Sequence, residues 1–561
     1  MHITLLLCNS VVMHIVINTS QHGKKIYNSV LLRESYRENG KVKKRTIANL
    51  SACSDEEVAA IRLALQNKNN LENLINVDKD IAVEQGLSIG AVWVISQVAK
   101  LLGIVKALGS DDSGKLALWQ VIARVLDQGS RLSAVRLARV HDVVNSAGIE
   151  KRFDEDDLYR NLAWLSDNQA TIEDRLFKLR HKEKPELFLY DVTSSYLEGD
   201  CNFFGEFGYN RDKKRGKQQI VIGLICDQKG VPLSVEVFPG NTQDMTTFSS
   251  QVEKVANRFG CERATLVGDR GMIKSAQIAG LPEGFSFITA ITKPQIESLL
   301  DRKIIQLGLF DNELCEIRED DIRYILRRNP CRAEEIEISR NNKRESVAAF
   351  VKAKNLYLAD HPRAEPSVAL RNVSEKIKKL KLDSWLRVEG TDRTLELIES
   401  GEALKELSRL DGCYVLKTNV SVEQADTKCV HDRYKDLAMV EHAFRTCKTD
   451  FLEVRPVYVR NEKNSRGHVF VVMLAYMIVH YLRQAWRDLD ITPEEGIKQL
   501  ATLCETKITV NGKGGCVKIP EPRKELKRLL APLNIAMPTI LRQDNPNVDT
   551  KTKLTKRKMK S

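Results

Sequence analysis

The chain has 561 residues, enough for about three or four domains of ~150 residues. Its 42% apolar and 29% charged residues are typical of an ordinary globular protein, and a chain of this length buries a core without disulfides or metals. The twelve scattered cysteines include no Cys-x-x-Cys pair, which excludes a disulfide framework or zinc site and favours a reducing, cytosolic compartment.

The net charge of +12 favours an anionic partner, with a basic protein of no such preference as the alternative. No segment has the ~18–20 apolar residues that span a bilayer, and the run from Val469 to Tyr481 is too short and contains His480. Residues 1–17 are apolar but lack a basic leader and a small-residue cleavage site, so we expect no signal peptide and no membrane partner. Met13-His-Ile repeats Met1-His-Ile, which leaves two candidate starts.

Residues 1–52 are expected to form a basic β-hairpin region. Residues 24–50 alternate polar and apolar side chains around Asn39-Gly40, and both of these positions tolerate the positive φ of a tight turn. Six basic residues flank the turn: Arg33, Arg37, Lys41, Lys43, Lys44 and Arg45. Such a hairpin either lies along a DNA backbone or presents a solvated surface.

Residues 53–182 are expected to form a helical N-terminal DNA-binding region. Their periodicity predicts helices over Glu56–Gln66, Ser88–Leu102, Lys115–Gln128, Ser133–Ala147 and Asp156–Arg180. Several guanidinium groups fall on two adjoining helices: Arg124, Arg131, Arg136 and Arg139. Either these arginines face DNA, or they are ordinary surface residues of a helical bundle.

Residues 183–294 change to a pattern of strands. Strands are expected at Leu187–Tyr196, Gln218–Cys226, Val231–Phe238, Ala264–Gly268 and Phe285–Ile291, with a helix around Thr246–Phe259 before the last two. This order predicts the α/β fold class with a mixed sheet.

Residues 295–410 interrupt this pattern and are expected to form an insertion domain. They contain a strand-like run at Arg323–Arg328 and charged helical runs near 333–355 and 371–380. The sheet is expected to resume in residues 411–486, with a strand at Cys413–Thr418, a helix around Asp432–Thr449 and an apolar helix at Val469–Trp486.

Residues 487–548 are expected to form a C-terminal region of helix and hairpin. Thr492-Pro-Glu-Glu495 is a capping box, and Asn511-Gly512 is a hairpin turn between residues 507 and 519. Residues 549–561 are a basic tail that we expect to be disordered.

Two aspartates occur within or directly after predicted strands that are otherwise largely apolar. On the strand 187–196, the face that begins with Leu187 and Leu189 turns polar at Asp191, which indicates a sheet edge in water or a residue that holds a cation. Asp269 follows the strand Ala264–Gly268, and Gly271 permits a sharp exit, although strand-terminal aspartates are also common caps. Their presence on one sheet strengthens the interpretation of both as site residues.

Glu441 lies on the helix predicted over 432–449. Tyr434, Glu441 and Lys448 are spaced by seven residues and so share a face, which Arg445 joins. An apolar stripe beside them would seat the helix on the sheet: Leu437, Val440, Phe444 and Cys447. The alternative is a surface helix with a Glu441–Arg445 ion pair worth about 0.3 kcal/mol, which leaves the two aspartates unexplained.

These blocks resemble the DDE transposases of bacterial insertion sequences, in the branch named after insertion sequence four and most closely its sixteen-thirty-four subgroup. Asp191-Val-Thr, Gly240-Asn241-Thr242 with Asp244, and Val-Gly-Asp269-Arg-Gly-Met resemble family segments. The signature Tyr-x2-Arg-x3-Glu-x6-Lys is similar to Tyr434, Leu437, Glu441 and Lys448. Leu437 stands in place of the signature arginine, for which Arg445 could partly substitute.

The resemblance implies an RNase H-like mixed sheet, interrupted by an insertion domain before the glutamate helix. The first aspartate is expected on the first strand and the second after the fourth. Asp191, Asp269 and Glu441 would be catalytic and would bind two Mg²⁺ ions, with Mn²⁺ as a substitute. DNA contacts are expected from Tyr434, Arg445, Lys448 and Arg270, besides the four helical arginines.

The resemblance further implies a cytoplasmic, nucleoid-associated transposase that cleaves its element at the terminal inverted repeats and joins the ends to target DNA. A homodimer is expected in the DNA complex, because two ends must be joined together. An RNase H-like nuclease without strand transfer is one alternative, and an inactive transposase-derived DNA-binding repressor, suggested by Leu437, is the other. The end sequence, the target and the hairpin or hydrolytic route of cleavage stay open.

Overall fold

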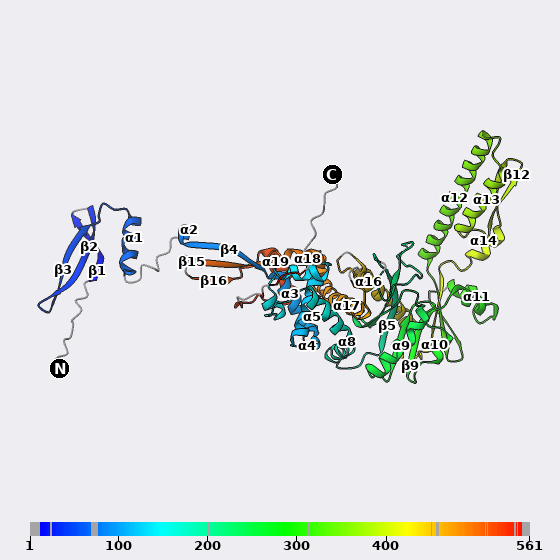
Figure 1. Ribbon diagram of the computed structural model, residues 1–561, viewed down its shortest axis with the longest axis horizontal. Helices are drawn as coiled ribbons and strands as arrows, with labels where there is room; N and C mark the ends of the chain where they lie inside the picture. Colours follow the sequence, from blue (N-terminus) through cyan, green and yellow to red (C-terminus); the bar gives the residue numbers. More distant parts are fainter. Residues whose placement is uncertain are drawn as a thin grey trace. The chain divides into compact units, whose positions relative to one another are not determined.

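The structure is a computed structural model of the chain (Figure 1). It describes residues 12–22, 25–68, 77–199, 201–212, 214–311, 313–449, 451–455, 459–510, 512, 514–542, 546 and 548–551. The chain divides into two compact units, Met1–Gly86 with Glu505–Lys518, and Leu87–Cys504 with Ile519–Ser561. The candidate start at Met1 and residues 552–561 of the basic tail lie outside the described residues.

The first unit is built on two three-stranded sheets, ordered β1-β2-β3 and β16-β15-β4. Their strands are β1 (Val12–His22), β2 (Lys25–Glu38), β3 (Lys41–Asn49), β4 (Ile81–Ser88), β15 (Cys504–Val510) and β16 (Gly514–Lys518), with the helices α1 (Asp55–Gln66) and α2 (Val77–Asp80). The predicted hairpin between β2 and β3 is confirmed, with φ of 48° at Asn39 and 79° at Gly40.

Strand β4 falls in the region predicted to be helical, and that prediction is wrong there. The strand is stabilised by β15, which comes from the far end of the chain, so no local pattern announces it. Gly86 of β4 lies against Glu505 of β15, where an added Cβ would be 2.8 Å from the Cβ of Glu505. A close approach of two backbones therefore fixes the residue type here.

The second unit begins with a helical bundle that contains most of the predicted helices. Its helices are α3 (Gly90–Leu101), α4 (Ile104–Leu108), α5 (Asp112–Leu126), α6 (Arg131–Leu137), α7 (Val143–Ala147) and α8 (Glu155–Arg180). Helix α17 (Glu462–Ala485) packs against α5 and α8. It is long and apolar enough to cross a membrane by length and composition alone, but most of it is buried within the unit, as in the core helix of a globular domain.

The single helix predicted over Ser133–Ala147 is wrong, because the chain breaks between α6 and α7. His141 forms a β-bridge with Ser88, and the N–H of Asp142 donates to the Ser88 carbonyl. The Asp142 carboxylate then accepts from the N–H of Asn145 and starts α7. A tertiary bridge and a cap together end one helix and begin the next.

The predicted mixed α/β sheet is present and has eight strands, ordered β10-β11-β14-β9-β8-β5-β6-β7. They are β5 (Leu187–Tyr196), β6 (Gln219–Asp227), β7 (Pro232–Pro239), β8 (Ala264–Gly268), β9 (Phe285–Ala290), β10 (Cys315–Glu319), β11 (Ile322–Arg328) and β14 (Cys413–Thr418). Strands β5, β6 and β7 are antiparallel, whereas β5, β8 and β9 run parallel.

Both faces of the sheet are buried, each in its own hydrophobic core. Leu187 and Leu189 of β5 belong to one core, together with α16 (Leu437–Lys448) and α17. Phe188 and Tyr190 belong to the other core, with α9 (Asp244–Glu253) and the π-helical turn Lys254–Arg258 that extends it. The side chain of Asp191 therefore projects toward the face that α16 covers.

The segment expected as an insertion, 295–410, divides in two. Strands β10 and β11 join the large sheet, since β11 pairs with β14. The remainder has its own core around Val347, Val373 and Trp385. It comprises α12 (Pro330–Asp360), α13 (Pro366–Lys379), β12 (Leu386–Thr391), β13 (Thr394–Glu399) and α14 (Gly401–Ser408). From its composition alone, the sequence does not show that β10 and β11 belong to the large sheet and not to the insert.

The remaining helices close the second unit. They are α10 (Ser275–Ala279), α11 (Lys293–Asp301), α15 (Thr427–Lys435), α18 (Pro493–Leu500) and α19 (Lys524–Leu530). The predicted capping box at the start of α18 is confirmed: the Thr492 hydroxyl accepts from the N–H of Glu495, whose carboxylate accepts from the N–H of Thr492.

Gly467 tests the packing of α17 on α8. A Cβ at this glycine would lie 2.1 Å from the backbone oxygen of Leu162, so Gly467→Ala should lower the free energy of unfolding by about 1–3 kcal/mol. Urea unfolding of the whole chain measures the difference. Gly401→Ala is the control, because a Cβ there meets nothing within 4 Å and should leave stability unchanged or slightly raised.

Candidate active site

The pairing of β5 with β8 brings the two aspartates together. These strands are parallel, and their last paired residues are Tyr190 and Gly268. Asp191 and Asp269 are the next residues along each strand, so both follow at the same level of the sheet. The chain then leaves β8 sharply, through Gly271 at a φ of 85°.

Helix α16 brings Glu441 to the same face of the sheet. It packs against β5, and the apolar stripe predicted for it is confirmed, because all four of its residues are buried: Leu437, Val440, Phe444 and Cys447. Burial of this stripe leaves the Glu441 side chain exposed. The Glu441–Arg445 ion pair of the alternative interpretation does not form among the described residues, and Arg445 is exposed as well.

Electrostatics links the three carboxylates. The pKa of Asp191 is raised to about 7, first by burial and then by the negative charges of Asp269 and Glu441. The N–H of Val192 and the guanidinium of Arg211 oppose this rise. Like charges raise a carboxyl pKa only where they lie close together, so the three acids share one environment.

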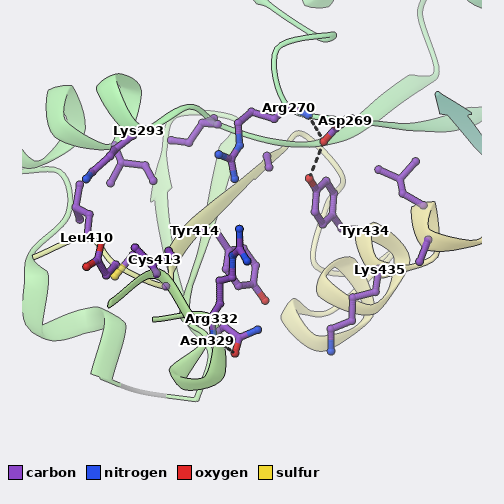
Figure 2. Close-up of a pocket in the computed structure, with 18 of the residues that line it drawn as sticks. Asp269, Arg270, Lys293, Asn329, Arg332, Leu410, Cys413, Tyr414, Tyr434 and Lys435 are labelled. Carbon is purple, nitrogen blue, oxygen red and sulfur yellow. Dashed lines mark hydrogen bonds between the residues drawn. The ribbon is translucent and has the colours of Figure 1, made fainter. Parts of the chain in front are cut away.

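Tyr434 lies beside Asp269, but not on the helix that carries Glu441. The prediction of one helix over 432–449 is wrong, because α15 and α16 are separated at Asp436. Tyr434 is therefore on α15, and its hydroxyl donates to Oδ1 of Asp269 at 3.4 Å (Figure 2). Burial and the carboxylates of Asp269 and Glu441 raise the pKa of Tyr434, which keeps the hydroxyl protonated as a donor.

Lys448 faces a residue that the sequence did not single out. Its Nζ lies 2.9 Å from Oδ1 of Asp212, and the other oxygen of that carboxylate accepts from the N–H of Tyr196 in β5. The neighbouring N–H of Arg211 donates to Oγ of Ser194, also in β5. The segment between β5 and β6 thus binds both the strand of Asp191 and the helix of Glu441. Its charged run could have marked it in the sequence.

The four helical arginines divide into two pairs. Arg124 and Arg131 are only 3% and 4% exposed, so neither presents its guanidinium to DNA as predicted. Arg124 donates to the carbonyls of Gln128 and Gly129, and burial lowers the pKa of both arginines, to about 9 and about 10. Arg136 is half-buried and Arg139 is exposed, though Arg139 pairs with Asp549.

A cleft of about 750 Å³ opens beside Asp269 (Figure 2). Asp269, Tyr434 and Glu441 lie along it. Five basic residues from separate elements also line it: Arg270, Lys293, Arg332, Arg340 and Lys435. Of these the sequence indicated only Arg270: Lys293, Arg332 and Arg340 are distant in the chain, and Lys435 follows Tyr434 but holds no signature position. Basic side chains around an acidic centre suit an anionic ligand that binds together with cations.

The donor chemistry of the acids fits a divalent cation. Among the residues that the structure describes, no three His, Cys, Asp or Glu side chains are already arranged to hold a metal. Oδ1 of Asp191 instead accepts from the N–H of Val192 at 2.7 Å, and Oδ1 of Asp269 from the N–H of Arg270 at 2.6 Å. Carboxylate oxygens are the ligands that Mg²⁺ prefers, and a cation would relieve the repulsion that raises the pKa of Asp191.

Two family models match the chain. One, described as IS1634 family transposase, N-terminal domain, matches residues 15–75, and the other, described as Transposase DDE domain, matches residues 182–478. No curated protein matches. Among solved structures, the piggyBac transposase synaptic complex with hairpin DNA covers 73% of this chain and 76% of its own chain, at 9% identity and a TM-score of 0.32, a likeness too low to carry an argument.

The raised pKa of Asp191 makes a prediction about stability. With a folded-state pKa of about 7 instead of 3.8, the native protein holds a proton that the unfolded chain releases, so stability falls as the pH rises from about 4 to about 7. Asp191→Asn removes this loss. In chelator-containing buffer at pH 8, its free energy of unfolding should exceed that of the unchanged protein by on the order of 2–4 kcal/mol, and the difference should shrink toward pH 4.

Urea unfolding at both pH values measures this difference. The exposed Asp301→Asn is the matched control and should leave the pH dependence unchanged. An Asp191→Asn protein that is no more stable than the unchanged chain at pH 8 would contradict a pKa of Asp191 raised by burial and by the neighbouring carboxylates.

Proposed function

The chain belongs to the DDE transposases of the IS1634 family, and on this basis we propose that its catalytic acids are Asp191, Asp269 and Glu441. As a DDE transposase, the protein is an enzyme that acts on DNA in transposition. The observation that carries the assignment is the β5–β8 register, which sets Asp191 beside Asp269 below the helix of Glu441.

The order of the sheet supports an RNase H-like core. Counting from β5, the strands run 3-2-1-4-5 in the sheet, the first three antiparallel and the next two parallel to the first. Asp191 is on the first of these strands, and Asp269 follows the fourth. This strand order, with the proposed catalytic glutamate on α16, supports the RNase H-like core that the resemblance implies.

Divalent metal ions are generally used by DDE transposase domains, and we propose two Mg²⁺ ions between the three acids, with Mn²⁺ as a substitute. Bound there, they would polarise the scissile phosphate and stabilise the attacking and leaving oxygens of an in-line displacement. The hydroxyl of Tyr434 orients the Asp269 carboxylate. The Lys448–Asp212 pair fixes α16 against the β5–β6 segment and so positions Glu441.

The cleft is the proposed path of the DNA backbone. Arg270 and Arg445 are both exposed near the acids and are available to phosphates, and Lys435 adds a further charge along the cleft. Arg136 and Arg139 stay candidates for a contact away from the acids, whereas the burial of Arg124 and Arg131 assigns them to the interior of the bundle. The exposed basic residues of the β2–β3 hairpin are a further candidate contact.

Leu437 does not argue for an inactive protein. Its side chain is buried against the core, yet it also borders the cleft that Arg270 and Lys435 line. A phosphate near this position therefore has other cations within the same cleft. We propose that these supply the charge that the signature arginine would bring.

We also propose that the protein acts as a homodimer, which joins two element ends.

Removal of any one acid should abolish catalysis without unfolding the protein. Asp191→Asn, Asp269→Asn and Glu441→Gln each remove a charge at nearly constant shape, so Mg²⁺-dependent cleavage of an element end should fall by at least about a thousandfold while binding to that end persists. Glu525→Gln, at an exposed acid on α19, is the control and should cleave normally. Full strand transfer by any of the three site variants would refute the triad.

Strand transfer from pre-cleaved ends separates the transposase from a nuclease that only cuts. The expected result is joined product with a pre-cleaved end and target DNA. Cleavage without any joined product would favour the nuclease, and binding without cleavage by the unchanged protein would favour the repressor.

Metal binding should also be visible without turnover. Because a ligand that binds only the native state raises its stability, millimolar Mg²⁺ should raise the melting temperature of the unchanged protein but not that of the Asp191→Asn, Asp269→Asn double variant. Chelator should remove both this shift and the cleavage activity, and Mn²⁺ should restore them. An equal shift in the double variant would place the metal elsewhere.

A further inference from the structure

The segment between β5 and β6 exposes three aromatic rings. We call Cys201–Lys217 the aromatic loop; Lys213 lies outside its described residues. Phe203 is 63% exposed, Phe207 64% and Tyr209 85%, the highest exposure among its large apolar neighbours. One further ring, Phe204, is buried and anchors the loop. Large apolar rings that remain in water at this density mark a binding surface.

The backbone that carries these rings is held firmly. Phe203 N–H donates to the Arg460 carbonyl at 2.8 Å, and Glu206 exchanges two backbone hydrogen bonds with Gln219 at the start of β6. The side-chain amide of Gln219 donates to the carbonyls of Tyr209 and Gly240. The exposed rings are thus presented by a fixed scaffold, and little order remains to be lost when a ligand binds them.

Close backbone packing at Gly208 seats the loop against the neighbouring turn. A Cβ at Gly208 would lie 2.2 Å from the carbonyl oxygen of Gly240, so the loop rests directly on the turn after β7. Gly208 separates Phe207 from Tyr209, and the rings on either side of it stay outside this contact.

The loop is also basic and adjoins the acids. Cys201–Lys217 contains five basic and two acidic residues. Lys214 and Arg215 are exposed, while Arg211 lies near enough to Asp191 to stabilise its carboxylate. Arg211 also donates to Oδ2 of Asp244 at 2.6 Å, which fixes its direction. Tyr209 lies two residues before Arg211, so exposed rings and positive charge occur together in the loop whose Arg211 faces Asp191.

We propose that the aromatic loop is a stacking platform for unpaired bases of the DNA strand that enters the proposed active site. This inference rests on the proposed function. Exposed rings interleaved with basic residues bind single strands, because every base has a π-face to stack and every nucleotide a phosphate to neutralise. A duplex hides its base faces, and an uncharged apolar partner would leave the basic residues unused, so an unpaired strand matches both features of the loop.

Binding of the full-length protein to two probes tests the platform. The probes are a labelled dT strand of ~20 nucleotides and a random duplex of equal length, measured by fluorescence anisotropy at one fixed ionic strength. Phe207→Ala and Tyr209→Ala should each weaken binding of the single strand by about tenfold and change duplex binding by less than about twofold. Tyr209→Phe should bind as the unchanged protein does, because it keeps the ring.

Tyr357→Ala is the matched control. This ring is 50% exposed but lies on α12, where it stacks on His361. The control should leave both affinities unchanged. Equal loss of single-strand and duplex binding in the loop variants would reduce the loop to a phosphate contact and overturn the proposal, as would no loss at all. Loss of a dimer in sedimentation with DNA binding intact would assign the rings to a second copy of the chain instead.

The platform and the proposed function fail separately. The Asp191→Asn, Asp269→Asn double variant should keep its preference for the single strand while losing cleavage. If the unchanged protein never cleaves DNA but Tyr209→Ala still loses the single strand selectively, the acid triad is wrong and the platform stands. If cleavage follows the acids but Tyr209→Ala binds and cleaves normally, the platform alone is refuted.

Discussion

The parallel pairing of β5 with β8 is the constraint on which the rest of the site depends. With Tyr190 paired to Gly268, the residues that follow must lie side by side, and a slip of one residue would turn Asp191 to the opposite face. Two carboxylates are held together in this way, and the pKa of Asp191 is raised first by burial and then by the charges of Asp269 and Glu441. The sheet withstands the repulsion because a hydrophobic core covers each of its faces.

The long stretch of chain between Asp269 and Glu441 follows from the same sheet. After β9 the chain adds β10 and β11 at one end of the sheet, forms the separately packed α12–α14 segment, and returns through β14. Since β14 pairs directly with β9, at Leu416 and Ala290, the chain re-enters next to the strand from which it left. An insert of any length is then compatible with the position of α16, provided that β14 keeps this partner. Loop length costs only a logarithmic entropy term, so the separation in sequence is cheap.

The features that were predictable from the sequence depend on local pattern. β5 and β8 have their predicted bounds because each is an apolar run that ends in a turn signal, and the stripe of α16 follows from helical spacing. The features that were missed depend on distant partners. The break between α15 and α16 lies where Tyr434 reaches Asp269, and Arg124 is drawn inward by carbonyls that include that of Leu452. Periodicity in the sequence predicts which face of a helix is buried, but not which distant groups contact its side chains.

The β5–β6 segment shows how one loop serves both geometry and recognition. Through Asp212 it binds β5 at Tyr196 and α16 at Lys448, so the strand of the first acid and the helix of the third are coupled by a single carboxylate. Asp212 and the N–H of Arg211 are used inward in these contacts, whereas the rings of Phe207 and Tyr209 are left exposed. A strand stacked on those rings would be registered against the acids by the same backbone that positions them. Binding energy gained on the rings would then be spent on orientation at the reacting phosphate, where it accelerates the reaction most.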